Sequence, residues 1–261
     1  MTKNIVMIHG MLAGSWCWKN YKSFFEQKNY HCYTPTLRFH HFPFNSIPPL
    51  QLGTTSILDY VNDLEKEIQQ LDSLPILIGH SMGGLIAQIL GSRGLAKALV
   101  LITPASPYGI LNLRLSVIKN FLSLLSQWGF WKKPFCETFS EFAYSAHLLS
   151  VEQQQNIYNR LVWESGQAAV EIGLSMFYRN SPTKVDESKV TCPVLVIGAK
   201  HDTVTPPVMV KKIAKKYHTV STYKEFSNHG HTILAEDSLL EVTKYISNWL
   251  LNPSERSMGY M

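Results

Sequence analysis

Five short apolar segments, separated by stretches with other patterns, constrain most strongly how this chain folds. They are NIVMIHG (4–10), YHCYTPT (30–36), PILIGH (75–80), KALVLITP (97–104) and CPVLVIGA (192–199). Their length and their β-branched residues are typical of strands that are buried on both faces. Strands of this kind that alternate with helices predict an α/β fold, with a mostly parallel sheet and helices on both of its faces.

Three other segments have the sequence pattern of helices. The clearest is SILDYVNDLEKEIQQL (56–71), where apolar residues form one stripe and Ser56 with Asp59 forms a predicted capping box. A second helix is predicted in PPVMVKKIAKKY (206–217), with proline in its first turn and Thr205 as its cap. A third is predicted near the C-terminus, in SLLEVTKYISNWLL (238–251). These helices are the expected covering layers of the sheet.

Residues 107–181 interrupt the alternation, because they are rich in aromatic residues and helical patterns but contain no clear strand. We interpret this segment as a helical cap (lid) inserted into a core domain formed by residues 1–106 and 182–261. Such a cap is expected over the carboxyl ends of the strands, where ligands bind in open α/β sheets. The alternative is that these helices form the core of a second domain.

Charge and cysteine content exclude several classes of function. Only 16% of the 261 residues are charged, and the basic residues behind the net charge of +5 are scattered. The densest cluster, KKIAKKYH (211–218), is expected to be a solvated helix face, since no aromatic-interleaved basic stripe accompanies it to suggest a nucleic-acid partner. The four cysteines form no CxxC pair, and no metal site is predicted. With no secretory signal and no membrane-spanning stretch in the sequence, a cytoplasmic protein is expected.

A serine follows the third predicted strand directly, in the pentapeptide Gly-His-Ser-Met-Gly (79–83). A bare Gly-x-Ser-x-Gly pattern arises often by chance, but here it lies between a strand and a helix. That context is the one of a nucleophile elbow, in which flanking glycines make room for a strained serine. The hydroxyl group of Ser81 is then expected to project above the sheet, at the positive end of the next helix.

A nucleophilic serine requires a base that accepts its proton and an acid that orients the base. On this scaffold the order along the chain is serine, acid, histidine. Asp202 follows the strand of residues 192–199 and is the predicted acid, although it also fits the role of a turn or helix cap. Asp186 and Asp237 are weaker candidates, because neither follows a buried strand.

Two histidines precede the last predicted helix, in SNHGHTILAED (227–237), and either His229 or His231 fits the required order. An oxyanion hole also needs two backbone N–H groups. The residue after the nucleophile, Met82, is one expected donor, and Met11, in the loop after the first strand, is the other. The His-Gly pair (9–10) before Met11 fits this geometry, and it also fits a plain tight turn.

Together these motifs resemble the α/β-hydrolase superfamily over nearly the whole chain. The matching pieces are IHG (8–10), GHSMGG (79–84), GAKHD (198–202) and GHTILAE (230–236). In that superfamily the catalytic histidine commonly follows a glycine and precedes a glutamate by five positions, as His231 does here. The resemblance therefore implies a catalytic triad of Ser81, Asp202 and His231, without a metal or other cofactor.

A narrower resemblance concerns HGMLAGSWCW (9–18), which is similar to the opening of the plant methylesterase and hydroxynitrile lyase group. The lyases of that group have threonine in place of the glycine after the first histidine, and lysine after the catalytic histidine. This chain has Gly10 and Thr232 at those positions. The resemblance implies ester hydrolysis rather than cyanohydrin cleavage.

The predicted function is that of a carboxylesterase-like or lipase-like serine hydrolase, acting on a small-molecule ester with an apolar part. Aromatic residues are the basis for the apolar preference, since Trp16, Trp18, Trp128 and Trp131 are candidates to line or roof a pocket; ordinary core packing is the alternative. Thioesterases, carbon–carbon bond hydrolases and perhydrolases use the same triad. A receptor that closes over a small molecule without chemistry is the competing class. The oligomeric state is left open.

Overall fold

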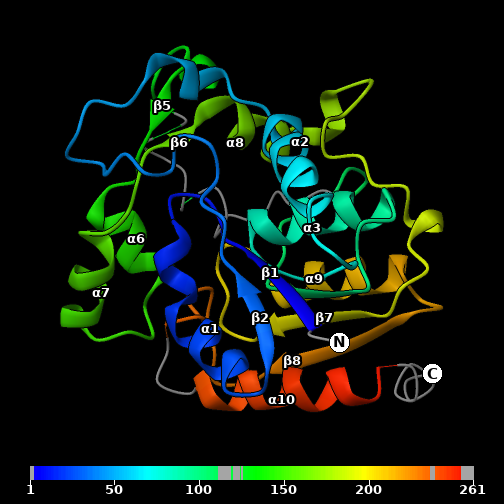
Figure 1. The fold of residues 1–261 in the computed structure, drawn as a ribbon. Helices are drawn as coiled ribbons and strands as arrows, with labels where there is room; N and C mark the ends of the chain where they lie inside the picture. Colours follow the sequence, from blue (N-terminus) through cyan, green and yellow to red (C-terminus); the bar gives the residue numbers. More distant parts are fainter. Residues whose placement is uncertain (1–2, 111–118, 120–123, 125, 236–238, 254–261) are drawn as a thin grey trace.

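A six-stranded sheet forms the centre of the molecule (Figure 1). The computed structural model describes residues 3–110, 119, 124, 126–235 and 239–253. The strands are β1 (Lys3–Ile8), β2 (Tyr30–Tyr33), β3 (Ile76–His80), β4 (Ala98–Ile102), β7 (Val194–Ala199) and β8 (Ser221–Phe226). They lie in the order β2-β1-β3-β4-β7-β8, and every neighbouring pair is parallel. The predicted α/β fold class is confirmed.

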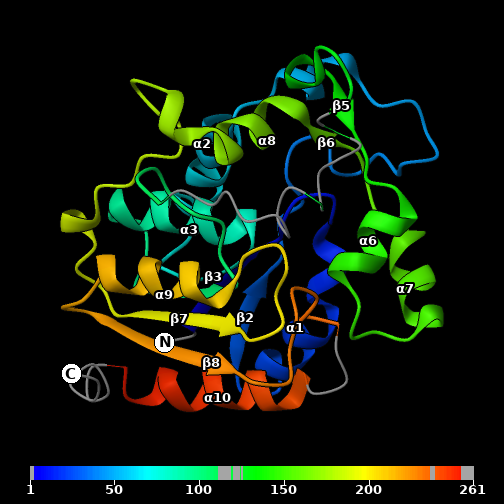
Figure 2. The ribbon, with the colours of Figure 1, turned by 180° about the vertical axis from the view of Figure 1, so that it is seen from behind.

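Helices cover both faces of this sheet (Figures 1 and 2). On one face lie α2 (Ile57–Ile68), α3 (Met82–Ser92) and α9 (Pro207–Lys216), and on the other lie α1 (Lys19–Glu26) and α10 (Leu239–Leu251). Along β1, Val6 and Ile8 pack into the first layer, whereas Ile5 and Met7 pack into the second. Because side chains alternate between two buried faces, the central strands have uninterrupted apolar sequences.

Strand β8 was not among the five predicted strands. Its sequence, STYKEF, buries only Thr222 and Phe226, and the strand pairs with β7 alone. An edge strand has one neighbour and tolerates charged side chains, such as those of Lys224 and Glu225 here. Strand β8 therefore lacks the continuous apolar run that marks the central strands in the sequence.

The capping predictions have different outcomes for α2 and α9. The box at the start of α2 is confirmed, since the backbone N–H of Ser56 donates to Asp59 Oδ2 over 2.9 Å. Helix α9 instead has Pro206 at its N-cap and no side-chain cap, so the prediction that Thr205 caps it is wrong. The hydroxyl group of Thr205 instead donates a hydrogen bond to Asp202 Oδ2 over 2.8 Å.

Among the described residues, three α-helices between β4 and β7 fall within the predicted cap: α6 (Phe139–Ser145), α7 (Val151–Tyr158) and α8 (Gly166–Gly173). Both views place α6 and α7 beyond the carboxyl ends of the strands (Figures 1 and 2). The segment also contains a two-residue antiparallel pair, β5 (Pro134–Phe135) with β6 (Glu164–Ser165), which is too short to leave a sequence signal. The first helical pattern of this segment is expected in LRLSVIKNFLSLLSQWGFWKKPF (113–135), and much of its first half lies outside the described residues. The limits 107–181 for a cap remain a proposal.

Short 3-10 helices complete the described chain, at Ser15–Trp18, Leu50–Thr54, Phe130–Lys132, Ser175–Phe177 and Glu187–Lys189. A small apolar cluster joins the cap segment to the loop after β1. It contains Leu12 from that loop together with Phe142, Leu149 and Leu161. The cap segment therefore packs directly against one of the loops at the carboxyl edge of the sheet.

Candidate active site

Ser81 occupies a strained turn between β3 and α3, with φ 52° and ψ −120°. A non-glycine residue rarely adopts a positive φ, and such strain is concentrated at functional sites. The turn requires its glycines: a Cβ on Gly79 would lie 2.2 Å from the backbone oxygen of Gly83, and one on Gly83 would lie 2.1 Å from that of Ile8. The turn is therefore built as the sequence motif predicted, with Ser81 at the N-terminus of a buried helix.

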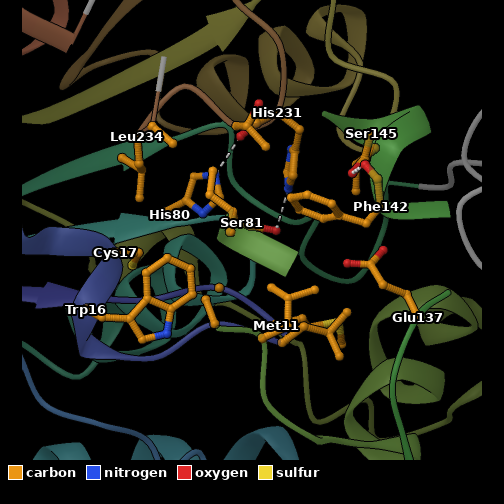
Figure 3. Close-up of a pocket in the computed structure, with 18 residues that line it drawn as sticks. Met11, Trp16, Cys17, His80, Ser81, Glu137, Phe142, Ser145, His231 and Leu234 are labelled. Atoms are coloured by element: carbon orange, nitrogen blue, oxygen red, sulfur yellow. Dashed lines mark hydrogen bonds between the residues drawn. The ribbon is translucent and has the colours of Figure 1, made fainter. Parts of the chain in front are cut away.

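Three predicted residues, Ser81, Asp202 and His231, come together at the carboxyl edge of the sheet. Figure 3 shows Ser81 and His231 side by side. Ser81 Oγ lies 3.1 Å from His231 Nε2, and His231 Nδ1 lies 2.8 Å from Asp202 Oδ2. An ionised carboxylate only accepts hydrogen bonds, so the proton of the neutral imidazole is on Nδ1. His231 Nε2 is then free to accept the proton of the Ser81 hydroxyl group.

Asp202 is held as a carboxylate by its surroundings. The amides of Val204 and Thr205 donate to its Oδ1 over 2.8 and 2.7 Å, and the hydroxyl group of Thr205 donates to Oδ2. Burial acts to raise the pKa of Asp202, but His231 and the hydrogen bonds from Thr205 outweigh it and hold the pKa below its ordinary value. Asp202 is thus kept charged beside the imidazole.

The alternative acids and the second histidine lie elsewhere. Asp186 forms an ion pair with Lys189 at the surface, and Asp237 is outside the described residues. His229 is fully buried, with its ring packed edge-on against Phe226. Of the two histidines, only His231 is within hydrogen-bond distance of Ser81.

Met11 and Met82 both lie beside Ser81. Met82 follows it in the chain, and Met11 follows Gly10, where an added Cβ would lie 3.0 Å from Ser81 Cβ. In the part of the chain that the structure describes, neither methionine amide donates to a protein acceptor. Both donors are therefore available to a group bound at Ser81.

A buried glutamate that the sequence analysis missed supports the loop of Met11. Glu164 has no exposed side-chain surface, and its Oε2 lies 3.4 Å from the amide of Leu12, a residue with φ 61°. His40 Nε2 and the hydroxyl group of Tyr60 also contact this carboxylate, each over 2.9 Å. Glu164 thus ties the strained loop to residues from two distant parts of the chain.

Two further histidines are neutral: His9 is fully buried, and His80 is partly buried. His80 Nε2 donates to the backbone oxygen of His231 over 2.9 Å, and His9 accepts from the amide of Leu37 at Nε2. Burial and the nearby His231 lower the pKa of His80 to about 3, and burial and the nearby His40 lower that of His9 to about 3. Each histidine therefore fixes a backbone segment of the site without adding positive charge.

Acidification is expected to destabilise the protein through these histidines. Each has a pKa that is lower in the folded state than the ordinary value of 6.5. The stability that each contributes is complete above pH 6.5 and is lost as the pH falls toward 3, because the unfolded chain takes up the proton first.

For His80 alone, the free energy of unfolding is expected to fall by about 2 kcal/mol when the pH is lowered from 7.5 to 5.0. Urea unfolding at the two pH values measures it, and His80→Gln should show a smaller pH dependence by that amount. An equal loss of stability in both proteins would contradict the assignment of a neutral His80.

A cavity of about 140 Å³ opens beside Ser81 and His231. Its lining is mostly apolar and comes from the loop after β1, from α6 and α7, and from the His231 loop. One of the four predicted substrate-binding tryptophans, Trp16, lines this cavity. The Arg160 guanidinium group lies over the Trp16 ring, 4.4 Å from its centroid.

The structure does not bring the other three tryptophans to this cavity. Trp18 is fully buried in the core layer between the sheet and helices α1 and α10, against Tyr21. Trp128 is 86% exposed, and Trp131 stacks edge-on against it at the surface.

Glu137, which the sequence analysis also missed, projects its carboxyl group into the cavity (Figure 3). Among the described residues, no cluster of histidine, cysteine and acidic side chains is arranged to hold a metal ion. No helix within the described ranges has the length and apolar character needed to cross a membrane.

The chain belongs to the alpha/beta hydrolase family, whose model matches residues 5–243. No curated protein sequence matches the chain significantly. Among solved structures it is similar to a Paleococcus ferrophilus monoacylglycerol lipase, with a TM-score of 0.70 and 18% identity over 97% of this chain and 96% of that one.

It is also similar to an esterase from Exiguobacterium antarcticum, with a TM-score of 0.71 and 19% identity over 96% and 92% of the two chains. A methylesterase from Arabidopsis gives a TM-score of 0.68 and 12% identity over 96% and 99%. At these identities the likeness extends to the fold alone.

Proposed function

We propose that this protein is a serine hydrolase that cleaves a carboxylic ester with an apolar part. The observation that carries the proposal is the series of hydrogen bonds from Ser81 through His231 to Asp202, with distances of 3.1 and 2.8 Å. A serine, a base and a buried acid in this geometry are the elements of nucleophilic catalysis.

Each residue has a defined role in the proposed reaction. Ser81 Oγ attacks the carbonyl carbon while His231 Nε2 takes its proton, and His231 then delivers that proton to the leaving alkoxide. Asp202 orients the imidazole and stabilises its charged form. The amides of Met11 and Met82 donate to the developing oxyanion. Water, activated by His231, then hydrolyses the acyl-enzyme and restores Ser81.

The apolar preference rests on the cavity beside Ser81. Leu12, Trp16, Phe142 and Ile157 are among the apolar side chains that line it. Its volume of about 140 Å³ is close to that of an engineered apolar cavity that binds benzene. A group of roughly that size therefore fits, whereas a long acyl chain must extend through the opening.

Nitrophenyl esters of increasing acyl length test this function. Two added methylene groups are worth roughly 1.6 kcal/mol when buried, so kcat/KM is expected to rise about tenfold from acetate to butyrate. Efficient cleavage of the acetate with no cleavage of the butyrate would contradict the apolar pocket. Thermal stabilisation by the esters without turnover would instead identify a binding protein. Thioesters compared at equal chain length distinguish an esterase from a thioesterase.

We also propose a cytoplasmic location. Cys17, Cys32, Cys136 and Cys192 are all free thiols. Free cysteines persist in reducing compartments, whereas oxidising ones favour disulfides.

A further inference from the structure

We propose that Glu137 is a specificity-determining residue that selects esters carrying a hydroxyl group on the part seated in the cavity. The inference rests on the proposed ester hydrolysis and names a feature of its substrate.

Glu137 is fixed in place by its neighbours in the cap segment. It lies one residue before Thr138, the N-cap of α6, and its backbone oxygen accepts a hydrogen bond from the Tyr158 hydroxyl group over 3.0 Å. Figure 3 shows its carboxyl group pointing into the cavity that Ser81 and His231 also line. A substrate bound at Ser81 with its apolar part in this cavity therefore meets the carboxyl group.

The carboxyl group of Glu137 receives no hydrogen bond from any described residue, which sets it apart from the buried glutamates. Glu164 accepts from Tyr60 and His40, and Glu171 accepts from the amide of Ile57 over 2.8 Å. The side chain of Glu137 is partly buried, so water reaches its carboxyl group through the cavity until a ligand fills that space. A ligand that displaces this water without supplying a hydrogen bond would leave the carboxyl group unpaired in mostly apolar surroundings, which is costly. We therefore expect the ligand itself to supply the partner.

The protonation state of Glu137 indicates what that partner is. Burial and the nearby Glu141 raise its pKa to about 8, so the group is mainly a neutral acid at pH 7. Cys136 and Tyr158 are its other titratable neighbours in the cap, and Cys17, His80 and His231 line the cavity opposite. A neutral carboxyl group both donates and accepts, as a hydroxyl group does. An ammonium group would require the ionised form, which these surroundings disfavour.

A matched set of esters tests the selection: methyl phenylacetate and its 2-, 3- and 4-hydroxy derivatives. The measured quantity is kcat/KM for each hydroxy ester divided by that for the parent ester. For at least one isomer this ratio is expected to fall about tenfold in Glu137→Met, which is the upper end for one lost hydrogen bond. Glu137→Gln should keep part of the preference, and Glu152→Met, on the exposed side of the cap, should keep all of it.

The pH dependence of KM distinguishes a role of Glu137 in substrate binding from a purely structural role. Above about pH 8 Glu137 ionises, so KM for the parent ester should rise in the native protein but not in Glu137→Gln. Ratios that stay within twofold in every variant would overturn the proposal. So would a preference for an aminomethyl ester that Glu137→Met abolishes.

Binding separates a failure of this inference from a failure of the proposed function. If the native protein cleaves no ester, the hydrolase proposal fails, and thermal stabilisation of Ser81→Ala by the same esters still tests Glu137. Stronger stabilisation by a hydroxy ester, lost in Ser81→Ala/Glu137→Met, supports the assignment. Equal stabilisation by all four esters contradicts it.

Discussion

Replacing Ser81 with alanine should lower kcat/KM for ester hydrolysis by at least about 10³-fold, because the group that forms the acyl-enzyme is then absent. His231→Ala should produce a loss of similar size, since an unassisted hydroxyl group is a poor nucleophile. The double variant should lose little more than either single one, because the two residues act as a unit. Steady-state kinetics on a nitrophenyl ester measure all three.

His201→Ala is the matched control for these variants. His201 is an exposed histidine next to Asp202 in the sequence. Its backbone N–H donates to the backbone oxygen of His229, and the substitution keeps this backbone group. Its replacement should leave kcat/KM within about twofold, as is usual for surface substitutions. If His231→Ala retained as much activity as His201→Ala, the assignment of His231 as the base would be wrong.

Replacing Glu164 with leucine should lower the free energy of unfolding by about 3–5 kcal/mol, which is typical when one partner of a buried ionic network is removed. The change leaves His40 Nε2, the Tyr60 hydroxyl group and the amide of Leu12 without their acceptor. Urea unfolding at neutral pH measures the loss. Because the Leu12 loop carries Met11, kcat should also fall, with a smaller change in KM.

Glu164→Gln separates hydrogen bonding from charge, since an amide oxygen still accepts from Tyr60 or His40 but not from all the donors. Its loss of stability should be smaller than that of Glu164→Leu and larger than that of the control Glu152→Gln. The control changes an exposed side chain on α7 and should lower the free energy of unfolding by less than about 0.5 kcal/mol. An equal stability of Glu164→Leu and the native protein would show that the buried network contributes nothing.

Much of the fold was predictable because its central strands are buried on both faces. Strands such as β3 and β7 have only apolar or glycine residues in sequence until they reach the carboxyl edge, which makes them visible without structural information. Strand β8 was not visible, because Lys224 and Glu225 interrupt its apolar pattern. Thr205 was assigned to a cap because it precedes a proline, but its hydroxyl group faces Asp202 instead.

Within the candidate site, the residues that lie in short motifs were predictable and those held by long-range contacts were not. Ser81 is marked by the glycines around it, which the turn requires. Glu164 acquires its role from contacts with His40 and Leu12, which are 124 and 152 positions away in sequence. Trp16 and Trp18 are two positions apart, yet one lines the cavity and the other lies in the core. Such differences depend on packing that local sequence does not encode.

Intact-mass spectrometry after exposure to a fluorophosphonate tests most directly whether Ser81 is an activated nucleophile. The reagent forms a covalent bond with an activated serine and releases fluoride, so the mass increases by one adduct. A single adduct on the native protein, absent from Ser81→Ala and formed much more slowly on His231→Ala, is the expected result. A folded native protein that forms no adduct, or an adduct that persists in Ser81→Ala, would contradict the proposed hydrolase.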